Sequence, residues 1–101
     1  MLKHIVLWKI KNEFQGVPKY QLIQEFKEKL ERLPELISDI IHLQVFVNFE
    51  GEGEQFCDIC LFSIHADRDS LKRYDAHPEH QKVLSFAKNI VTERRVVDAL
   101  S

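Results

Sequence analysis

The alternation of apolar and polar positions predicts four β-strands. Residues 2–11 carry β-branched and aromatic side chains on both faces, which predicts a strand that is covered on both sides. Apolar and polar residues alternate over 40–49, and 55–64 has the composition of a third strand, so these two segments are expected to form a hairpin. The segment 92–100 is more polar, as is typical of a strand at the edge of a sheet.

Apolar residues at intervals of three and four predict a first helix over 19–33. They form one stripe, and the opposite side of the helix is charged. Pro34 is expected to end or kink this helix, because proline disfavours helical geometry at the preceding residue. The segment 12–17, with Gly16 as its flexible point, is expected to be a turn between the first strand and this helix.

A second helical region, in two pieces, is predicted before the last strand. Asp67 or Asp69 is suited to cap a short helix that contains Tyr74. Pro78 is suited to the first turn of the next helix. Along that helix His80 falls on the apolar stripe, so its side chain is predicted to point inward.

The element order β-α-β-β-α-β predicts a ferredoxin-like α+β domain, in which helices cover one face of an antiparallel sheet. The other face would carry Ile5 and Leu7 from the first strand, together with apolar residues of the second strand. Because an exposed apolar face of that extent is unfavourable in water, we expect a second subunit to cover it. The sequence therefore predicts a homodimer.

Composition narrows the class of protein. The chain of 101 residues is expected to form one domain over 1–101, and 45% hydrophobic with 30% charged residues is typical of a globular protein. The net charge of −2 is scattered, which argues against nucleic acid or an anionic membrane as a partner. No apolar run is long enough to span a membrane and no secretory leader opens the sequence, so a cytoplasmic location is expected.

A cysteine pair and a run of glutamates are both predicted to be structural. Cys57 and Cys60 form a lone C-x-x-C, but in a strand residues three apart point to opposite faces, so buried structural cysteines are expected rather than a redox pair. The glutamates of 50–54 alternate with turn glycines, which predicts a solvated turn rather than a cation site.

The stretch 74–80 holds a tyrosine and two histidines around a proline. An imidazole near neutral pKa removes a proton next to a carbonyl, and a phenol donates a hydrogen bond to the developing enolate oxygen. Tyr74 and His80 are therefore the candidate catalytic residues, with His80 as the base. The alternatives are ligand binding without chemistry, and a structural role in which both side chains are packed and hydrogen-bonded.

His4, Trp8 and His77 are the candidates for substrate binding. His4 and Trp8 share one face of the first predicted strand, and a histidine on an apolar face needs a polar partner. His77 precedes Pro78 at the position of a helix N-cap, where a role in orienting the helix is the alternative. The histidines have no neighbouring carboxylate or thiolate at a recognisable ligand spacing, so neither a metal nor a haem or other cofactor is expected.

The sequence resembles the stress-responsive A/B barrel domain family, Dabb, from end to end. The resemblance rests on the opening segment 3–11, on Asp58, and on the motif Tyr74-x-x-His77-Pro78-x-His80. It implies a ferredoxin-like monomer and a dimeric α+β barrel with a small pocket between sheet and helices. In a plant polyketide cyclase similar to this family, the tyrosine and the last histidine of the motif serve an aldol-type ring closure, and the opening histidine faces the pocket.

Two classes of function follow from the residues and from the resemblance. The first is a cofactor-independent lyase, cyclase or isomerase that acts on a small carbonyl or aromatic compound. The second is a non-catalytic, stress-associated binding or structural homodimer, in which the same residues hold the helix and the pocket together.

Overall fold

A computed structural model of the chain describes residues 1–49, 53 and 55–100, and its main element is a four-stranded antiparallel sheet with the order β4-β5-β1-β6. The strands of this sheet are β1 (Leu2–Ile10), β4 (His42–Val47), β5 (Ile59–His65) and β6 (Val91–Leu100). The last strand pairs with β1 and lies at one edge, as predicted from its polar composition.

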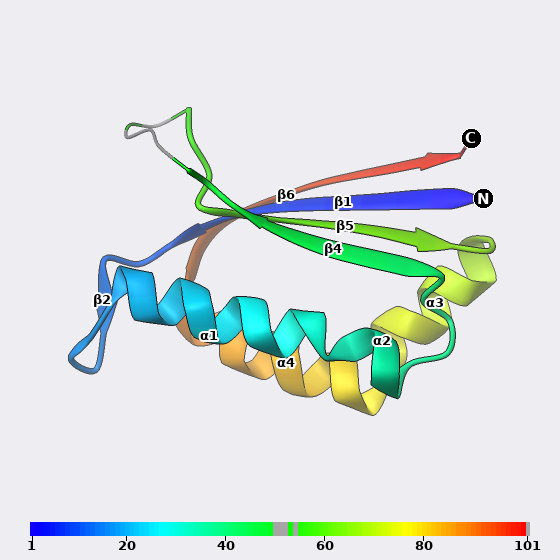
Figure 1. Ribbon diagram of the computed structural model, residues 1–101, viewed down its shortest axis with the longest axis horizontal. Helices are drawn as coiled ribbons and strands as arrows, with labels where there is room; N and C mark the ends of the chain where they lie inside the picture. Colours follow the sequence, from blue (N-terminus) through cyan, green and yellow to red (C-terminus); the bar gives the residue numbers. More distant parts are fainter. Residues whose placement is uncertain (50–52, 54, 101) are drawn as a thin grey trace.

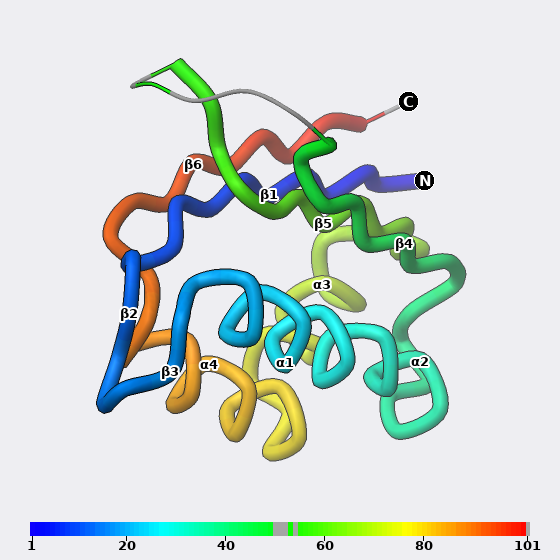
Figure 2. The backbone as a smooth tube through the Cα atoms, turned by 60° about the vertical axis from the view of Figure 1, so that its left-hand side comes forward, coloured from blue at the N-terminus to red at the C-terminus, as the bar shows by residue number. Residues whose placement is uncertain are grey.

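The helices all lie on one face of the sheet (Figure 1). They are α1 (Lys19–Glu31), α2 (Leu33–Leu36), α3 (Arg68–Ala76) and α4 (Pro78–Ile90). Figure 2 shows α1 and α4 side by side below the strands, and Figure 1 shows α3 under the end of the sheet where both termini lie. Element order and strand order together define a ferredoxin-like α+β fold, as the hydrophobic pattern predicted. No helix within the described part of the chain is long and apolar enough to cross a membrane.

Several element boundaries differ from the prediction. The second strand is shorter than expected and the third begins later than expected, because the regular β4–β5 pairing ends at Val47 opposite Ile59. Cys57 therefore lies outside the strand, and both cysteines are free and half-buried rather than buried. The predicted acidic turn over 50–54 lies, apart from Gly53, outside the described residues.

The turn after β1 contains a small hairpin that the sequence pattern did not predict. Its strands are β2 (Glu13–Phe14) and β3 (Val17–Pro18), which pair with each other. Gln15 and Gly16 both have positive φ, which is the conformation that a tight two-residue hairpin turn requires. Two-residue strands carry too little alternation to be recognised from the pattern alone.

The helix ends follow the predicted capping residues. The Asp67 carboxylate accepts a hydrogen bond from the backbone N–H of Ser70 at 2.8 Å, so Asp67 rather than Asp69 caps α3. Pro78 is the first residue of α4. Pro34 lies in the first turn of α2, just after α1 ends at Glu31, so it stops the first helix as expected.

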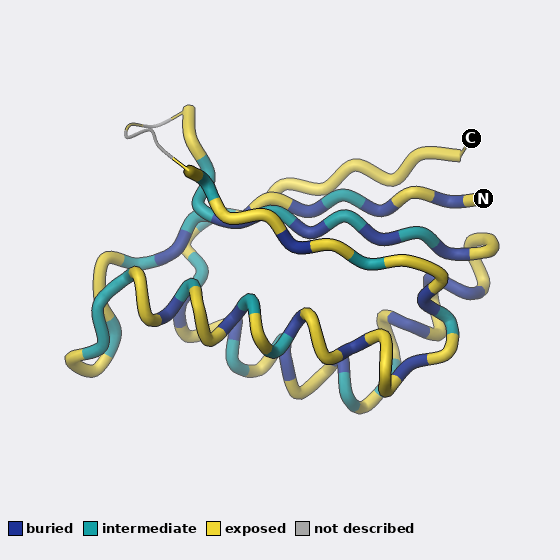
Figure 3. Tube along the Cα trace, viewed as in Figure 1, coloured by how far each residue is buried: buried dark blue, intermediate teal, exposed yellow. Residues whose placement is uncertain are grey.

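The side chains of the sheet alternate between a helix-covered inner face and an outer face without a helix layer. On β1 the even-numbered residues are buried, and Val6 is only 1% exposed. The outer face carries apolar side chains around Ile5, which is paired with Phe62 on β5 and Val97 on β6. Figure 3 shows that β6 is exposed along almost its whole length. The outer face of the described residues is therefore an uncovered apolar surface.

Asp58 anchors the end of β1 to the loop before β5. Its carboxylate accepts a hydrogen bond from the backbone N–H of Ile10 at 2.8 Å, and the Lys19 ammonium lies 3.4 Å from it at the start of α1. The backbone N–H of Asp58 donates to the carbonyl of Trp8. Asp58, which is part of the family resemblance, thus has a structural role in joining β1, β5 and α1.

Candidate functional site

Tyr74 lies at the centre of a cluster of histidines on the inner face of the sheet. Its ring centroid is 4.4 Å from that of His80 and 4.9 Å from that of His65, so the phenol is held between two imidazoles. His4 from β1 approaches the same ring at 6.2 Å in an edge-on arrangement. The cluster joins two strands and two helices, and Tyr74 itself is 0% exposed.

The break between α3 and α4 brings Tyr74 and His80 together. Tyr74 is in the last turn of α3, and His80 is in the first turn of α4. Pro78 lacks a backbone N–H, so it begins α4 while α3 ends at Ala76. The two rings converge across this corner, which the residue spacing alone was unable to establish.

His80 is held as the tautomer that leaves one ring nitrogen basic. Its Nδ1 lies 3.0 Å from the backbone carbonyl oxygen of Asp75, and a carbonyl only accepts hydrogen bonds, so Nδ1 carries the proton. Burial lowers the pKa of His80 below its ordinary value, which keeps the ring neutral near pH 7. No described residue forms a hydrogen bond with Nε2, so its lone pair is free to take a proton.

Tyr74 is suited to donate rather than to accept a proton. Burial raises the pKa of its hydroxyl well above the ordinary value, so the group stays protonated across the neutral range. The hydroxyl forms no hydrogen bond with another described residue, and because no buried side-chain oxygen among these residues lacks a partner, its oxygen is not sealed in the core but reaches the small cavity that Tyr74 lines. The O–H group is therefore available to a bound molecule.

His4 and His65 differ in how fully their ring nitrogens are used. His65 Nδ1 donates to the Asp39 carbonyl at 2.9 Å, and its Nε2 accepts from the Ser63 hydroxyl at 2.9 Å, so both nitrogens are satisfied. His4 Nδ1 donates to the Asp98 carboxylate at 2.5 Å, which leaves its Nε2 without a partner in the described chain. His65 is thus a structural histidine, whereas His4 retains a polar atom for a ligand.

A small cavity lies between this cluster and the helices. It is lined by His4, Val6, Trp8, Phe26, Leu30, Leu61, Tyr74, His80, Val83, Leu84 and Arg94. Its volume is about 10 Å³, which is the space of about one water molecule. Leu84 is half-buried and Arg94 is exposed, so these two side chains form the mouth of the cavity between α4 and β6. A substrate larger than water requires them to move.

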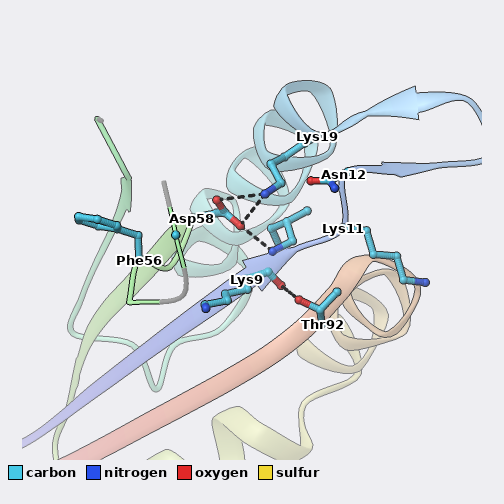
Figure 4. Close-up of a pocket in the computed structure, with 9 residues that line it drawn as sticks. Lys9, Lys11, Asn12, Lys19, Phe56, Asp58 and Thr92 are labelled. Carbon is cyan, nitrogen blue, oxygen red and sulfur yellow. Dashed lines mark hydrogen bonds and ion pairs between the residues drawn. The ribbon is translucent and has the colours of Figure 1, made fainter. Parts of the chain in front are cut away.

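A larger cavity of about 680 Å³ lies at the other end of β1 (Figure 4). Its lining includes Lys9, Lys11 and Lys19, but these ammonium groups are already engaged: Lys9 with Glu93, Lys11 over the Phe14 ring and Lys19 with Asp58. In Figure 4, Lys9 and Lys11 point in different directions, away from Asp58. Because the ammonium groups are already engaged and Lys9 and Lys11 diverge, this cavity is a weaker candidate site than the smaller one.

The structure brings together four of the five residues that the sequence singled out. His4, Trp8, Tyr74 and His80 all line the small cavity, whereas His77 does not. The His77 Nδ1 instead accepts a hydrogen bond from the backbone N–H of Glu79 at 3.1 Å, which makes it the N-cap of α4. The capping alternative for His77 is confirmed by this contact.

Sequence reasoning missed three residues of the site: His65, Arg94 and Asp98. His65 shares a strand face with Leu61 and Ser63 in the alternating pattern of β5, so period-two spacing was a usable signal. Arg94 and Asp98 enter the site only through the pairing of β6 with β1, which is a contact between distant parts of the chain. Their position was not readable from local pattern.

No group of three or more potential metal ligands converges among the described residues. His4, His65 and His80 surround the Tyr74 ring from different sides, and the Nδ1 atom of each donates a hydrogen bond to oxygen. This arrangement is typical of a hydrogen-bonding site.

Replacing the helix cap at His77 is expected to lower stability without altering the small cavity. For His77→Ala, the free energy of unfolding should fall by about 1 kcal/mol, because the Glu79 N–H loses its acceptor. Asparagine is also a favourable N-cap, so His77→Asn should stay close to the wild type. Urea denaturation followed by circular dichroism measures both variants. Equal losses for the alanine and asparagine variants would contradict the capping role.

Stability is expected to fall as the pH drops below 6.5. Burial lowers the pKa of His65 and of His80 below the ordinary value of 6.5, so the unfolded chain takes up protons that the folded chain does not. Their contribution is constant above pH 6.5 and is lost progressively towards the lower folded pKa. Urea denaturation at neutral and mildly acidic pH measures this loss, which His80→Gln should reduce. A stability that is unchanged or higher just below pH 6.5 would contradict the assignment.

The sequence and the fold match a known family. The family model of the stress-responsive A/B barrel domain, Dabb, matches residues 2–100. A dimeric protein of unknown function with a ferredoxin-like fold from Bacteroides fragilis is 33% identical, with a TM-score of 0.86 over 99% of this chain and 95% of that chain. No curated protein sequence matches the chain.

More distant structures share the fold. The hydroxynitrile lyase from Passiflora edulis is 9% identical, with a TM-score of 0.82 over 99% of this chain and 92% of that chain. An antibiotic biosynthesis monooxygenase is 17% identical, with a TM-score of 0.75 over 100% of this chain and 98% of that chain. Identities this low show the fold alone. With the match over residues 2–100, the chain belongs to the stress-responsive A/B barrel domain family.

Proposed function

We propose that this protein is a cofactor-independent enzyme that moves a proton at the carbon next to a carbonyl group of a small molecule. The observation that carries the proposal is the Tyr74–His80 pair: a free basic nitrogen and a protonated phenol on rings whose centroids are 4.4 Å apart. General-base and hydrogen-bond-donor groups in this proximity are what enolate formation requires.

In the proposed reaction, His80 Nε2 removes the proton from the carbon next to the carbonyl. The electron pair of the broken C–H bond moves into the carbonyl, and the resulting enolate oxygen accepts a hydrogen bond from the Tyr74 hydroxyl. The His80 imidazolium then returns its proton to the product. Reprotonation at another atom gives an isomerase, attack on a second carbonyl gives a cyclase, and loss of a leaving group gives a lyase.

The remaining polar groups of the cavity support binding in this proposal. His4 Nε2 accepts a hydrogen bond from the substrate, while the Asp98 carboxylate fixes the tautomer of His4. Trp8 and Phe26, whose ring centroids are 4.8 Å apart, provide an apolar wall. The fold itself is compatible with lyase activity, because the Passiflora edulis protein with this fold is a hydroxynitrile lyase.

We also propose that the protein is a homodimer closed through the outer face of the sheet. The apolar side chains around Ile5 support this, since Val97 is 57% and Phe46 51% exposed in the single chain. Dimeric proteins with this fold include the Bacteroides fragilis relative. The helices lie on the opposite side of the sheet (Figure 1), and the small cavity is lined by residues of α4 and of the inner face of β1, so such a dimer leaves the cavity mouth accessible.

A second candidate function is a non-catalytic, stress-associated homodimer. The observation that favours it is the cavity volume of about 10 Å³, which admits no substrate without movement of the side chains at its mouth. In this case the Tyr74 and histidine cluster serves to pack α3 and α4 against the sheet.

The two functions are separated by proton exchange in D₂O. Small β-dicarbonyl, aromatic and polyketide-like carbonyl compounds are first screened for a rise in melting temperature. NMR then follows the replacement of the protons next to the carbonyl by deuterium. Faster exchange with the wild type than with Tyr74→Phe supports the enzyme. Tyr20→Phe, on the exposed face of α1, is the control and should stay fully active. Exchange unaffected by Tyr74→Phe would contradict it.

A further inference from the structure

Among the described residues, the small cavity is lined by a single residue of the charged types lysine, arginine, aspartate and glutamate, and this residue is Arg94. It lies opposite Trp8 in the β1–β6 pairing, so both side chains are on the inner face of the sheet. The next residue, Arg95, lies opposite Leu7 on the outer face. The register of the edge strand therefore puts one arginine at the cavity mouth and its neighbour on the other side of the sheet.

The Arg94 guanidinium has no acceptor within the described part of the chain. The carboxylates closest to it in sequence are committed elsewhere: Glu93 binds Arg95 at 2.8 Å and Lys9 at 3.4 Å, and Asp98 binds His4 at 2.5 Å. A guanidinium has five N–H donors and is always charged. An exposed arginine without a partner is common. One that lines a cavity of otherwise uncharged residues offers its N–H donors to a ligand that enters the cavity.

The charge of Arg94 influences the pKa of both Tyr74 and His80. Burial is the main influence on the pKa of both side chains, lowering that of His80 and raising that of Tyr74. Arg94 adds to the lowering of the His80 pKa and opposes the increase for Tyr74. The guanidinium thus favours negative charge in the cavity, including the charge of an enolate.

We infer that Arg94 binds the carboxylate of the substrate, which makes the substrate class a small oxo acid. This inference rests on the proposed function, because the carbonyl is placed at Tyr74 and His80. A planar carboxylate matches the two-pronged geometry of a guanidinium at the mouth, and the apolar lining takes the hydrocarbon part of the molecule. A single arginine, without further donors beside it, suits this monoanion better than a phosphate dianion.

The inference is tested with acids paired with their neutral amides. Phenylpyruvate, benzoylacetate and 4-oxo-4-phenylbutanoate differ by one carbon in the distance from carbonyl to carboxylate, and each is compared with its primary amide. Dissociation constants are measured by calorimetry for the full-length wild type, Arg94→Gln and Arg94→Lys. Arg68→Gln is the control, because it removes the same charge from the exposed first residue of α3.

At least one acid is expected to bind the wild type about 10- to 100-fold more tightly than its amide, as for a charge-assisted hydrogen-bond pair. Arg94→Gln should remove this preference, Arg94→Lys should keep part of it, and Arg68→Gln should keep all of it. Equal binding of acids and amides, a preference that survives Arg94→Gln, or no binding by any acid would each overturn the inference.

Proton exchange in D₂O separates this inference from the proposed function. Arg94-dependent binding of an acid whose protons do not exchange supports carboxylate recognition and contradicts the enzyme. Fast exchange of the neutral amides, unchanged in Arg94→Gln, supports the enzyme and contradicts carboxylate recognition. Circular dichroism of each variant shows whether it is folded, and Arg94→Lys provides a charge-conserving comparison if Arg94→Gln is unstable.

Discussion

His80→Gln is expected to slow the exchange of protons next to the substrate carbonyl by about 10²- to 10⁴-fold, the usual contribution of a general base. Glutamine retains an N–H group that is able to donate to the Asp75 carbonyl, as His80 Nδ1 does. It has no basic nitrogen to replace Nε2. The measurement is the rate of deuterium incorporation by NMR under saturating substrate, so that a change in binding does not imitate a change in rate.

His42→Gln is the matched control for this experiment. His42 is exposed on β4, and its ring packs against Phe62 rather than against the Tyr74 cluster. The control should exchange protons at the wild-type rate. Wild-type exchange in His80→Gln would contradict the assignment of the base. A variant that is slow only because it is partly unfolded is recognised from its melting temperature.

Leu7→Glu is expected to convert the dimer into a monomer. Leu7 is 36% exposed on the central strand β1, on the same outer face as Cys60 and Arg95 to which it is paired. The added carboxylate would be removed from water in the proposed interface, and the neighbouring guanidinium of Arg95 is already paired with Glu93, so its burial costs several kcal/mol. Light scattering should give twice the chain mass of 12.0 kDa for the wild type and the single mass for the variant.

Tyr20→Glu is the control for the dimer experiment. Tyr20 is 71% exposed on α1, on the helical side of the molecule, so the same added charge should leave the dimer intact. A wild-type protein that is monomeric, or a Leu7→Glu variant that remains dimeric, would contradict the proposed interface. Loss of the dimer in Tyr20→Glu would instead place the interface on the helices.

The strands and helices were predictable wherever one face of an element is buried, because burial imposes the period of the element on the sequence. The inward position of His80 followed from its place on the apolar stripe of α4, and its side chain is 9% exposed. The start of α4 at Pro78 followed from local chemistry in the same way. These predictions needed only neighbouring residues.

The parts of the site that depend on strand register were not predictable. Arg94 and Asp98 meet β1 through pairs more than eighty residues apart in sequence, such as Trp8 with Arg94. A shift of the register by one residue would exchange Arg94 for Arg95 at the cavity. The convergence of Tyr74 and His80 likewise depends on the angle between α3 and α4, which residue spacing does not determine.

¹⁵N NMR of the histidine side chains shows, without a substrate, whether His80 presents a basic, unprotonated Nε2 beside the Tyr74 phenol. Histidine-labelled wild type and His80→Gln are compared to assign the signal. We expect a neutral His80 ring at pH 7 with the proton on Nδ1, and a pKa below 6.5. A proton on Nε2, or an imidazolium at pH 7, would contradict the role of His80 as the base.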